Sequence, residues 1–336
     1  MTVVGPFGLS VRDQALEADV QVGLTAVEEG LLEATKSEVP FITEAAQHLV
    51  RAGGKRFRPL LVMLAAQFGD PYAPGIVPSA VVVELTHLAT LYHDDVMDEA
   101  EVRRGVDSAN TRWGNSVAVL TGDFLFSRAS HMLADLGPEA VRIQAEAFER
   151  LVTGQILETA GPRDGRDPVD HYLDVLAGKT GSLVAVACRF GAMMSGADET
   201  VVDVLTQYGE RLGVAFQLAD DVLDIASDSR ESGKTPGTDL REGIPTLPVL
   251  RLRERAERLG LPEDAALCAL LDSDLSDDAR LTEALELLRE HPALEQARRD
   301  TVRYAEEARS ALAPLPECAA KTALTEMCEL VVHRAG

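Results

Sequence analysis

The sequence predicts an all-α protein, and three features lead to that prediction. Apolar residues recur at spacings of three and four along most of the 336-residue chain, whereas sustained alternation of apolar and polar residues is scarce. Aromatic residues make up only 4%, and the dominant residues, such as Ala, Leu, Glu and Arg, lose little side-chain freedom in helices. Turn-forming pairs such as Gly53-Gly54, Gly137-Pro138 and Gly161-Pro162 separate the periodic segments.

Eleven segments have the pattern of helices. They run over 12–35, 40–52, 58–68, 78–98, 115–135, 138–159, 169–193, 199–226, 246–258, 278–290 and 293–312. Polar stretches at 161–168 and 227–237 are expected to be loops. The length alone would permit two domains, but no obvious linker divides the chain.

Composition and charge narrow the class of protein. With 46% hydrophobic and 26% charged residues, the chain can bury a sizeable core. A net charge of −23 disfavours a nucleic-acid partner and favours solubility. The four cysteines lack Cys-x-x-Cys spacing, which indicates neither a zinc site nor a disulfide framework. With no signal peptide and no apolar stretch of about 18 residues, we expect a cytoplasmic protein.

Two similar aspartate triads each close an apolar segment. The first lies in HDDVMD (93–98) and the second in QLADDVLD (217–224). On a helix the carboxylates of each triad share one arc, where like charges repel unless cations intervene. A solvated helix end is the ordinary interpretation of one triad, but the residues before both triads are too apolar for it. Hard carboxylate oxygens suit Mg²⁺, which commonly joins carboxylates to substrate phosphates, so the triads predict a diphosphate held through Mg²⁺.

Basic residues stand out against this acidic background. GGKRFRP (53–59) places three cations after two glycines at the start of a helix, and arginine side chains match phosphate oxygens. His87, seven residues before Asp94, is either a satisfied core histidine or a donor to an anion. Each cluster alone could be a surface patch, but together they predict two anions, one held through metal and one by direct contact. The remaining basic sites are Arg103, Arg104, Lys179 and Lys234.

In combination these segments resemble the trans-isoprenyl diphosphate synthases, also called polyprenyl synthetases. The resemblance covers roughly residues 45 to 250 and depends on motif order as well as content. In chain order the motifs are GGKRFRP, ELTHLATLYHDDVMDEAEVRRG, GDFLFSRA, LVTGQ, KTGSL, FQLADDVLD and GKTPGTDLREG. The first triad and its surroundings look most like the long-chain synthases of respiratory quinones.

The resemblance implies an all-α isoprenoid synthase fold, with antiparallel helices around a deep central cavity. It implies a single domain over residues 1–336, with about ten N-terminal residues outside the ordered fold. The implied activity is that of a Mg²⁺-dependent prenyltransferase, with about three Mg²⁺ ions per active site. Such an enzyme condenses an allylic diphosphate, farnesyl or geranylgeranyl, with successive isopentenyl diphosphates to an all-trans product. The resemblance also implies a homodimer.

The resemblance assigns roles to individual residues by their position in the motifs. The Mg²⁺ ligands are Asp94, Asp98 and Asp220, supported by Asp95, Asp221 and Asp224. The isopentenyl diphosphate site comprises Lys55, Arg58, His87 and Arg104. Contacts to the allylic diphosphate come from Arg103, Lys179 and Lys234, while Thr180 and Gln217 line the reacting centre.

One position departs from the family pattern. Members often carry a lysine in the segment that reads LREGIPTLP here, and this chain has Ile244 at that place. One contact to the diphosphate or to metal-bound water is therefore expected to be missing, which would loosen the second metal half-site.

The helix before the first triad is expected to guide the growing product. Four and five positions before Asp94 lie Thr90 and Ala89, where short-chain members typically carry aromatic side chains, and Thr86 further back is also small. Small side chains predict an open tunnel and a long product. The resemblance to the synthases of respiratory quinones implies a length of about C35 to C50, for the side chain of menaquinone or a similar quinone. A geranylgeranyl diphosphate synthase, with a C20 product for carotenoid or terpenoid precursors, is the alternative.

Two other classes share parts of this pattern. A terpene cyclase would have the first triad and a helical fold, but it would usually replace the second triad and lack GGKRFRP. A non-catalytic subunit of a two-component synthase would lack the triads. Because GGKRFRP and both triads are present, the sequence favours the synthase.

Overall fold

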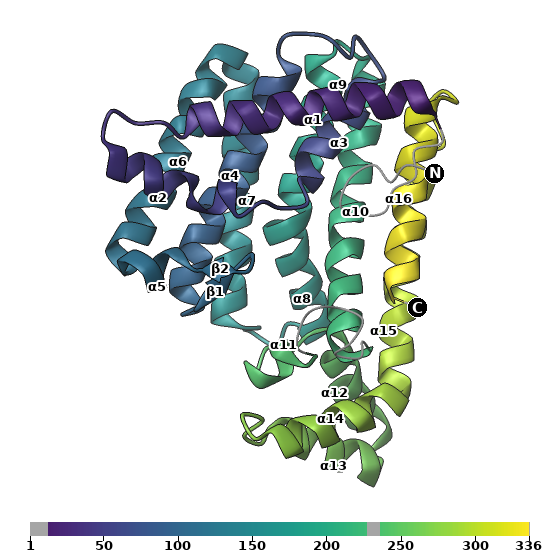
Figure 1. Ribbon diagram of the computed structural model, residues 1–336. Coiled ribbons are helices and arrows are strands. Elements are labelled where there is room, and N and C mark those ends of the chain that lie inside the picture. The colour runs from purple at the N-terminus through teal and green to yellow at the C-terminus, as the bar shows by residue number, and fades with distance from the viewer. Residues whose placement is uncertain (1–12, 227–235, 336) are drawn as a thin grey trace. The chain divides into compact units, whose positions relative to one another are not determined.

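The computed structural model describes residues 13–226 and 236–335, and over these ranges the protein is almost entirely helical (Figure 1). The longer helices are α1 (Gln14–Ala34), α2 (Pro40–Arg51), α3 (Phe57–Ala66), α4 (Ile76–Met97), α6 (Asn115–Leu136), α7 (Pro138–Ala160), α8 (Pro168–Leu176), α9 (Ser182–Met194), α10 (Glu199–Ala226), α12 (Leu247–Leu259), α13 (Pro262–Leu271), α14 (Asp278–Glu290), α15 (Pro292–Ala311) and α16 (Ala319–Ala335). Shorter elements are α5 (Ala109–Trp113), α11 (Thr238–Arg241), the π-helical turn η1 (Ala177–Gly181) and the antiparallel strands β1 (Val102–Arg103) and β2 (Val106–Asp107). The prediction of an all-α fold is confirmed.

Local sequence accounts for several helix ends. Asp13 caps α1, because its carboxylate accepts hydrogen bonds from the N–H groups of Ala15 and Leu16 at 2.9 and 3.0 Å. Asp167 caps α8 in the same way, and the proline that follows occupies a position where no N–H donor is needed. Gly260 ends α12 in the left-handed conformation, with a φ of 62°.

The expected helices agree with the observed ones to within two residues at each end, with one qualification. The expected segment 169–193 consists of α8 and α9, joined by the π-helical turn η1. The sequence analysis did not predict the β1–β2 hairpin, the short helices α5 and α11, or the longer helices α13 and α16. The N-terminal segment expected to lie outside the ordered fold falls outside the described residues.

Two compact units make up the chain, and each combines segments that are far apart in the sequence. Unit 1 comprises residues 1–149, 183–209 and 311–326, and unit 2 comprises residues 150–182, 210–310 and 327–336. Every boundary between the units falls inside a helix, as at residues 149 and 150 within α7. The single domain over residues 1–336 stays a prediction.

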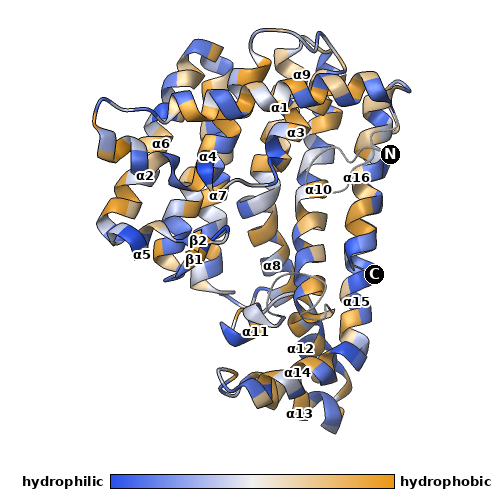
Figure 2. Cartoon of the chain, in the orientation of Figure 1, coloured by the Kyte–Doolittle hydropathy of each residue, from blue (hydrophilic) through white to orange (hydrophobic). Residues whose placement is uncertain are grey.

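In unit 1, α4 packs along α6 and against α1 and α3. Most residues of α3 and α4 are hydrophobic, and most are buried, as expected of helices in the interior of a unit (Figure 2). Leu85 and Leu88 of α4 are fully buried in this core. The hydroxyl of Tyr92, also on α4, donates to the carbonyl of Ala45 at 2.6 Å, which fixes the C-terminal half of α4 against α2.

In unit 2, α12 packs against α8 and α13, and α13 contacts α14. Val222 of α10, Leu252 of α12 and Leu288 of α14 are fully buried. Arg289 of α14 donates from Nε to the carbonyl of Ile225 at 2.8 Å. This contact holds the end of α10, where the second aspartate triad lies.

Among the described residues, one helical run is long and apolar enough to cross a membrane by length and composition alone. It spans Pro168–Met194, with a mean hydropathy of 1.2 over its most apolar stretch. The sequence analysis expected no apolar stretch of about 18 residues, and this run departs from that expectation. Because 78% of the apolar stretch is buried inside the protein, it has the character of a core helix, and it is weak support for a membrane span.

Candidate functional site

The first aspartate triad lies at the C-terminal end of α4, and its carboxylates have different surroundings. Asp95 is fully buried, Asp94 is partly exposed, and the Asp98 side chain is 54% exposed. Asp98 ends the helix, since its N–H donates to the carbonyl of Asp94 at 2.8 Å. Asp94 and Asp98, one turn apart, are therefore accessible at the helix end, whereas Asp95 faces the interior.

The β1–β2 hairpin follows the triad and carries Arg103 against it. Arg103 Nε donates to Asp95 Oδ1 at 2.6 Å, and its Nη2 lies 4.0 Å from Asp98 Oδ2. Burial raises the pKa of Asp95, and Arg103 opposes that rise because it favours the charged carboxylate. Arg103, for which the resemblance implied a diphosphate contact, thus contacts the carboxylates of the triad.

Arg104, the next residue, lies against the GGKRFRP segment. Its Nη1 donates to the carbonyl of Leu49 at 3.1 Å and also to that of Gly53. A Cβ on Gly54 would come within 2.9 Å of the Arg104 guanidinium carbon. Gly54 also has a φ of 154°, which residues with a side chain rarely adopt, so the backbone conformation favours a glycine at this position.

Arg58 and His87, both partly exposed, form a basic cluster with Arg104. Burial lowers the pKa of Arg58 to about 10, with a contribution from Arg104 and an opposing one from Glu84. Burial and the nearby arginines also hold the pKa of His87 well below its ordinary 6.5. Arg58 Nε is buried, and it has no hydrogen-bond partner among the residues that the structure describes. A guanidinium with a buried, unused donor suits an anion, and Lys55 is exposed on the same segment.

Arg56 has a different part in the same motif. It is only 8% exposed, and its guanidinium donates to Glu28, to Glu84 and to the carbonyl of Val50. Its donors are therefore engaged within the protein. Arg56 of GGKRFRP therefore serves as a buried ion-pair partner within the protein.

In unit 2, the middle aspartate of the second triad is held by a tyrosine. Asp221 is 2% exposed, and the hydroxyl of Tyr172 on α8 donates to its Oδ2. Burial raises the pKa of Asp221 to about 7, while hydrogen bonds from Tyr172 and Gln217 counteract part of that rise. Gln217, expected at the reacting centre, thus lies next to the triad.

The outer aspartates of the second triad also have defined contacts. Arg334 of α16 donates from Nη2 to Asp220 Oδ1 at 2.7 Å. Asp224 accepts hydrogen bonds from the N–H groups of Thr238 and Asp239, each at 3.2 Å. Asp224 therefore caps α11, the short helix in the motif that also contains Lys234. Lys234 itself lies outside the described residues.

Lys179 and Thr180 lie in the π-helical turn η1, a feature that often marks functional sites. Lys179 Nζ forms an ion pair with Glu158 Oε2 at 2.6 Å. A Cβ on Gly154 of α7 would lie 2.8 Å from the backbone nitrogen of Lys179, and one on Gly178 would lie 2.9 Å from a backbone oxygen of α7. The glycines in LVTGQ and just before KTGSL therefore allow α7 and η1 to touch.

The residues expected to govern product length lie on α4 in unit 1. Ala89 is fully buried, Thr86 is 1% exposed, and Thr90 is partly exposed. Thr86 Oγ1 accepts a hydrogen bond at 2.9 Å from Nε2 of Gln144 on α7. Gln144 is a buried polar residue in this region that the sequence analysis did not identify.

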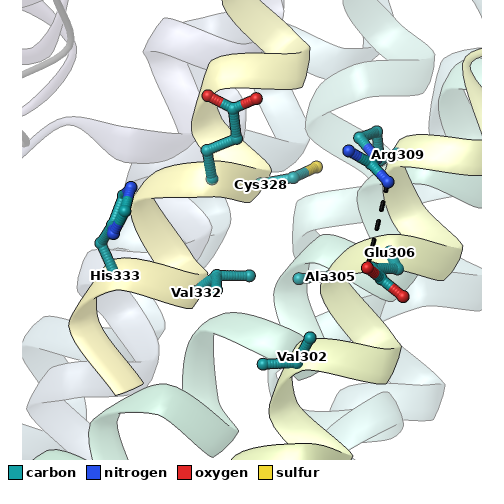
Figure 3. A pocket seen from close by; sticks show the side chains of 8 residues that line it. Val302, Ala305, Glu306, Arg309, Cys328, Val332 and His333 are labelled. Carbon is teal, nitrogen blue, oxygen red and sulfur yellow. Dashed lines mark ion pairs between the residues drawn. The ribbon is translucent and has the colours of Figure 1, made fainter. Parts of the chain in front are cut away.

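Two hollows in unit 2 lie apart from most predicted site residues. A groove between α15 and α16 is lined by Val302, Cys328 and His333, with the Glu306–Arg309 ion pair on one side (Figure 3). It contains none of the predicted site residues. A larger cavity of about 390 Å³ is lined partly by Ile244. At this position the chain has an apolar wall where the family often has a lysine.

The first triad supplies carboxylate oxygens of the kind that bind divalent cations. In residues 13–226 and 236–335, no three His, Cys, Asp or Glu side chains gather closely enough to hold a metal ion. However, Asp95 Oδ2 is buried and has no hydrogen-bond partner in that part of the chain. An unsatisfied carboxylate oxygen beside two further aspartates supplies the hard oxygen donors that Mg²⁺ prefers.

Comparison with known proteins gives a consistent result. A sequence model of the family named polyprenyl synthetase matches residues 39–288 of this chain. The chain belongs to the polyprenyl synthetase family. It is 47% identical over 331 residues to nonaprenyl diphosphate synthase from Mycobacterium tuberculosis, covering 98% of this chain and 97% of that protein.

Solved structures in the polyprenyl synthetase family are also similar to this chain. Geranylgeranyl pyrophosphate synthase from Corynebacterium glutamicum, complexed with calcium and isoprenyl diphosphate, is 44% identical with a TM-score of 0.87, covering 97% of this chain and 99% of that one. A decaprenyl diphosphate synthase from Rhodobacter capsulatus is 35% identical with a TM-score of 0.86, covering 96% and 99%. The expected family, isoprenoid synthase fold and prenyltransferase class are confirmed.

Besides Gln144, the sequence analysis did not identify Glu84, Tyr172 and Arg334, which contact predicted site residues. Glu84 carried a signal, since an acidic residue inside the apolar run VVVELTHL is unusual. Tyr172 and Arg334 carried none, because neither belongs to a motif and each reaches the second triad from a distant helix.

Proposed function

We propose that this protein is a Mg²⁺-dependent prenyltransferase that extends an allylic diphosphate with successive isopentenyl diphosphates to a long all-trans chain. The observation that carries the proposal is the arrangement along α4. The aspartate triad at its C-terminal end and His87 of the basic cluster, seven residues earlier, lie about two helical turns apart. One helix thus carries carboxylates for an anion held through metal and a histidine for an anion bound without metal. This arrangement suits a reaction between two diphosphates.

The proposed roles follow the residues and their contacts. Asp94, Asp98 and Asp220 would bind the divalent cations that hold the allylic diphosphate, about three ions in all, with Asp95, Asp221 and Asp224 as supports. Isopentenyl diphosphate would bind to Lys55, Arg58, His87 and Arg104. Arg103, Lys179 and Lys234 would contact the allylic diphosphate. The fit of Asp95 Oδ2 and Arg58 Nε to these ligands supports the assignment.

The chemistry requires a charged leaving group and a protected cation. Bound Mg²⁺ would neutralise the charge that develops on the departing diphosphate. The basic cluster orients isopentenyl diphosphate so that its double bond attacks the allylic cation, and a proton is then lost to the released diphosphate. The amide of Gln217 and the backbone near Lys179 and Thr180 provide dipoles that stabilise the cation. Apolar helix segments before each triad exclude water from it.

We propose that the product is about C35 to C50 long and serves as the side chain of a quinone such as menaquinone. The small residues Ala89 and Thr90 before the first triad support this length. Relatives named for nonaprenyl and decaprenyl products support it as well. A C20 product is the second candidate, because a similar structure is that of a geranylgeranyl pyrophosphate synthase.

We further propose a cytoplasmic homodimer whose chain folds as one domain. On α6, Leu120 is 65% exposed and Val119 is 39% exposed, and Phe41 on α2 is 48% exposed. Large apolar side chains at the surface of one unit are typical of an interface between subunits. Sedimentation of the purified protein measures the oligomeric state directly.

Product analysis tests the function. The protein is incubated with farnesyl or geranylgeranyl diphosphate and isopentenyl diphosphate, with Mg²⁺ or with excess chelator, and the dephosphorylated products are sized by chromatography. A ladder that ends at long chains and disappears with chelator supports the proposal. A product that stops at C20 supports the second candidate, and a cyclic hydrocarbon made from farnesyl diphosphate alone indicates a terpene cyclase.

A further inference from the structure

Glu84 is a buried acidic residue in the middle of α4. It is only 2% exposed, and its neighbours in the sequence, Val83 and Leu85, are fully buried. Burial of a charged carboxylate is costly unless cations compensate it. Two guanidinium groups do so here, since Glu84 Oε1 lies 3.1 Å from Arg56 Nη1 and 3.8 Å from Arg104 Nη2.

The carboxylate lies among several like charges. Arg56, Arg58 and Arg104 are close enough to influence one another, and Arg104 helps to lower the pKa of Arg58. Glu84 acts in the opposite direction on all three and favours their charged forms. Glu84 therefore provides a buried negative charge that favours the charged forms of all three arginines.

Glu84 also helps to fix the direction of Arg104. One end of that guanidinium donates to the backbone carbonyls of Leu49 and Gly53, and the other end faces Glu84. Glu28, the other carboxylate of this network, pairs directly with Arg56 and acts on Arg104 only as a weaker, more distant charge, and its side chain is 44% exposed. The two carboxylates therefore differ in burial and in the arginines that they hold.

We propose that Glu84 is a positioning residue for the diphosphate of isopentenyl diphosphate. It keeps Arg104 oriented beside Arg58, so that the remaining donors of Arg104 are available to an anion before that anion arrives. Donors held in place in advance bind more tightly than donors that must be ordered on binding. The inference rests on the proposed function, in which Arg58 and Arg104 bind isopentenyl diphosphate.

The Glu84→Gln variant tests the inference, because glutamine keeps the shape and an acceptor oxygen but removes the charge. We expect the KM for isopentenyl diphosphate to rise about tenfold, while the KM for the allylic diphosphate changes less than about twofold. Glu28→Gln is the matched control and is expected to change both constants less than about twofold. An equal change in both KM values, or a change in kcat alone, overturns the inference.

Two further variants keep the result interpretable. If Glu84→Gln does not fold by circular dichroism, Glu84→Asp takes its place. Because the shorter side chain retains the charge but reaches less far, we expect a rise of about threefold in the KM for isopentenyl diphosphate only. An unchanged value overturns the inference.

Arg58→Ala separates this inference from the proposed function. A selective rise in the KM for isopentenyl diphosphate in Arg58→Ala, without one in Glu84→Gln, rejects the role of Glu84 alone. No selective rise in Arg58→Ala rejects the proposed substrate site and the role of Glu84 with it.

Discussion

Arg103 and Asp95 form an ion pair that joins the β1–β2 hairpin to the first aspartate triad, with 2.6 Å between Nε and Oδ1. Asp95 is fully buried, whereas the Arg103 side chain is 30% exposed. The arginines after HDDVMD therefore have separate tasks: Arg103 compensates the inward carboxylate, and Arg104 lies against the backbone of the GGKRFRP segment. Arg103 and Arg104 are neighbours in the sequence, but the turn that contains them directs each side chain to a different partner.

Loss of Arg103 should leave Asp95 as a buried charge without compensation. We expect Arg103→Ala to lower the free energy of unfolding by about 2 kcal/mol, measured by urea denaturation with chelator present. Asp95→Asn in the same chain removes that charge and should restore most of the loss. A double variant no more stable than Arg103→Ala would mean that the pair does not carry this energy.

The Tyr172 hydroxyl is expected to hold the Asp221 carboxylate in its charged form. Since the hydrogen bond from Tyr172 lowers a pKa that burial raises to about 7, Tyr172→Phe should raise the pKa of Asp221 further. The acidic limb of the pH profile of kcat/KM, measured at saturating Mg²⁺, should then move to higher pH.

Tyr208→Phe is the matched control for that measurement. Its hydroxyl is also buried and donates at 2.8 Å to the carbonyl of Leu324, in unit 1. Both variants should lose about 1–2 kcal/mol of unfolding free energy, but only Tyr172→Phe should shift the pH profile. Identical profiles for the two variants would count against a role of Tyr172 at the triad.

The helices and triads were predictable because their signals are local. Apolar spacing, caps and glycine-proline pairs recur along the sequence, so the long helices could be placed within two residues. Helix α16 was missed although it has 17 residues. It follows the segment LAPLPEC (312–318), which contains two prolines, and no glycine or proline lies within α16 itself.

The partners of the site residues could not be predicted, because they depend on contacts between distant segments. Arg56 and Arg58 are two residues apart in one motif, yet one is saturated with hydrogen bonds and the other keeps an unused donor. Arg56 precedes α3 in a left-handed conformation, with a φ of 46°, whereas Arg58 lies within the helix. Arg334 reaches Asp220 from 114 residues away, a pairing that no local pattern encodes.

His87 should make stability depend on pH. Its pKa in the folded protein is well below the ordinary 6.5, because burial and nearby arginines disfavour the protonated ring. Below pH 6.5 the unfolded chain therefore binds a proton that the folded protein does not, so this contribution is complete above pH 6.5 and is lost as pH falls.

The His87→Gln variant measures this contribution. Between pH 7 and pH 5 it should lose less unfolding free energy than the parent protein, by up to about 2 kcal/mol. His333→Gln is the control, since that histidine belongs to α16 in unit 2, whereas the arginine cluster belongs to unit 1. Equal losses in His87→Gln and the parent would show that His87 titrates normally in the folded protein.

Ala89 should limit product length when it is enlarged. Its backbone oxygen would lie 3.1 Å from a Cβ at Gly122, so α4 and α6 leave little spare room beside it. A phenyl ring at this position must therefore fill the space before the triad, at a cost of about 1–3 kcal/mol in stability. With farnesyl and isopentenyl diphosphates, chromatography should detect products shorter than those of the parent protein.

Ala80→Phe is the matched control, because Ala80 is equally buried on α4 but lies nine residues further from Asp94. It should carry a similar stability cost and shorten the product less, and equal shortening by both variants would attribute the effect to general overpacking.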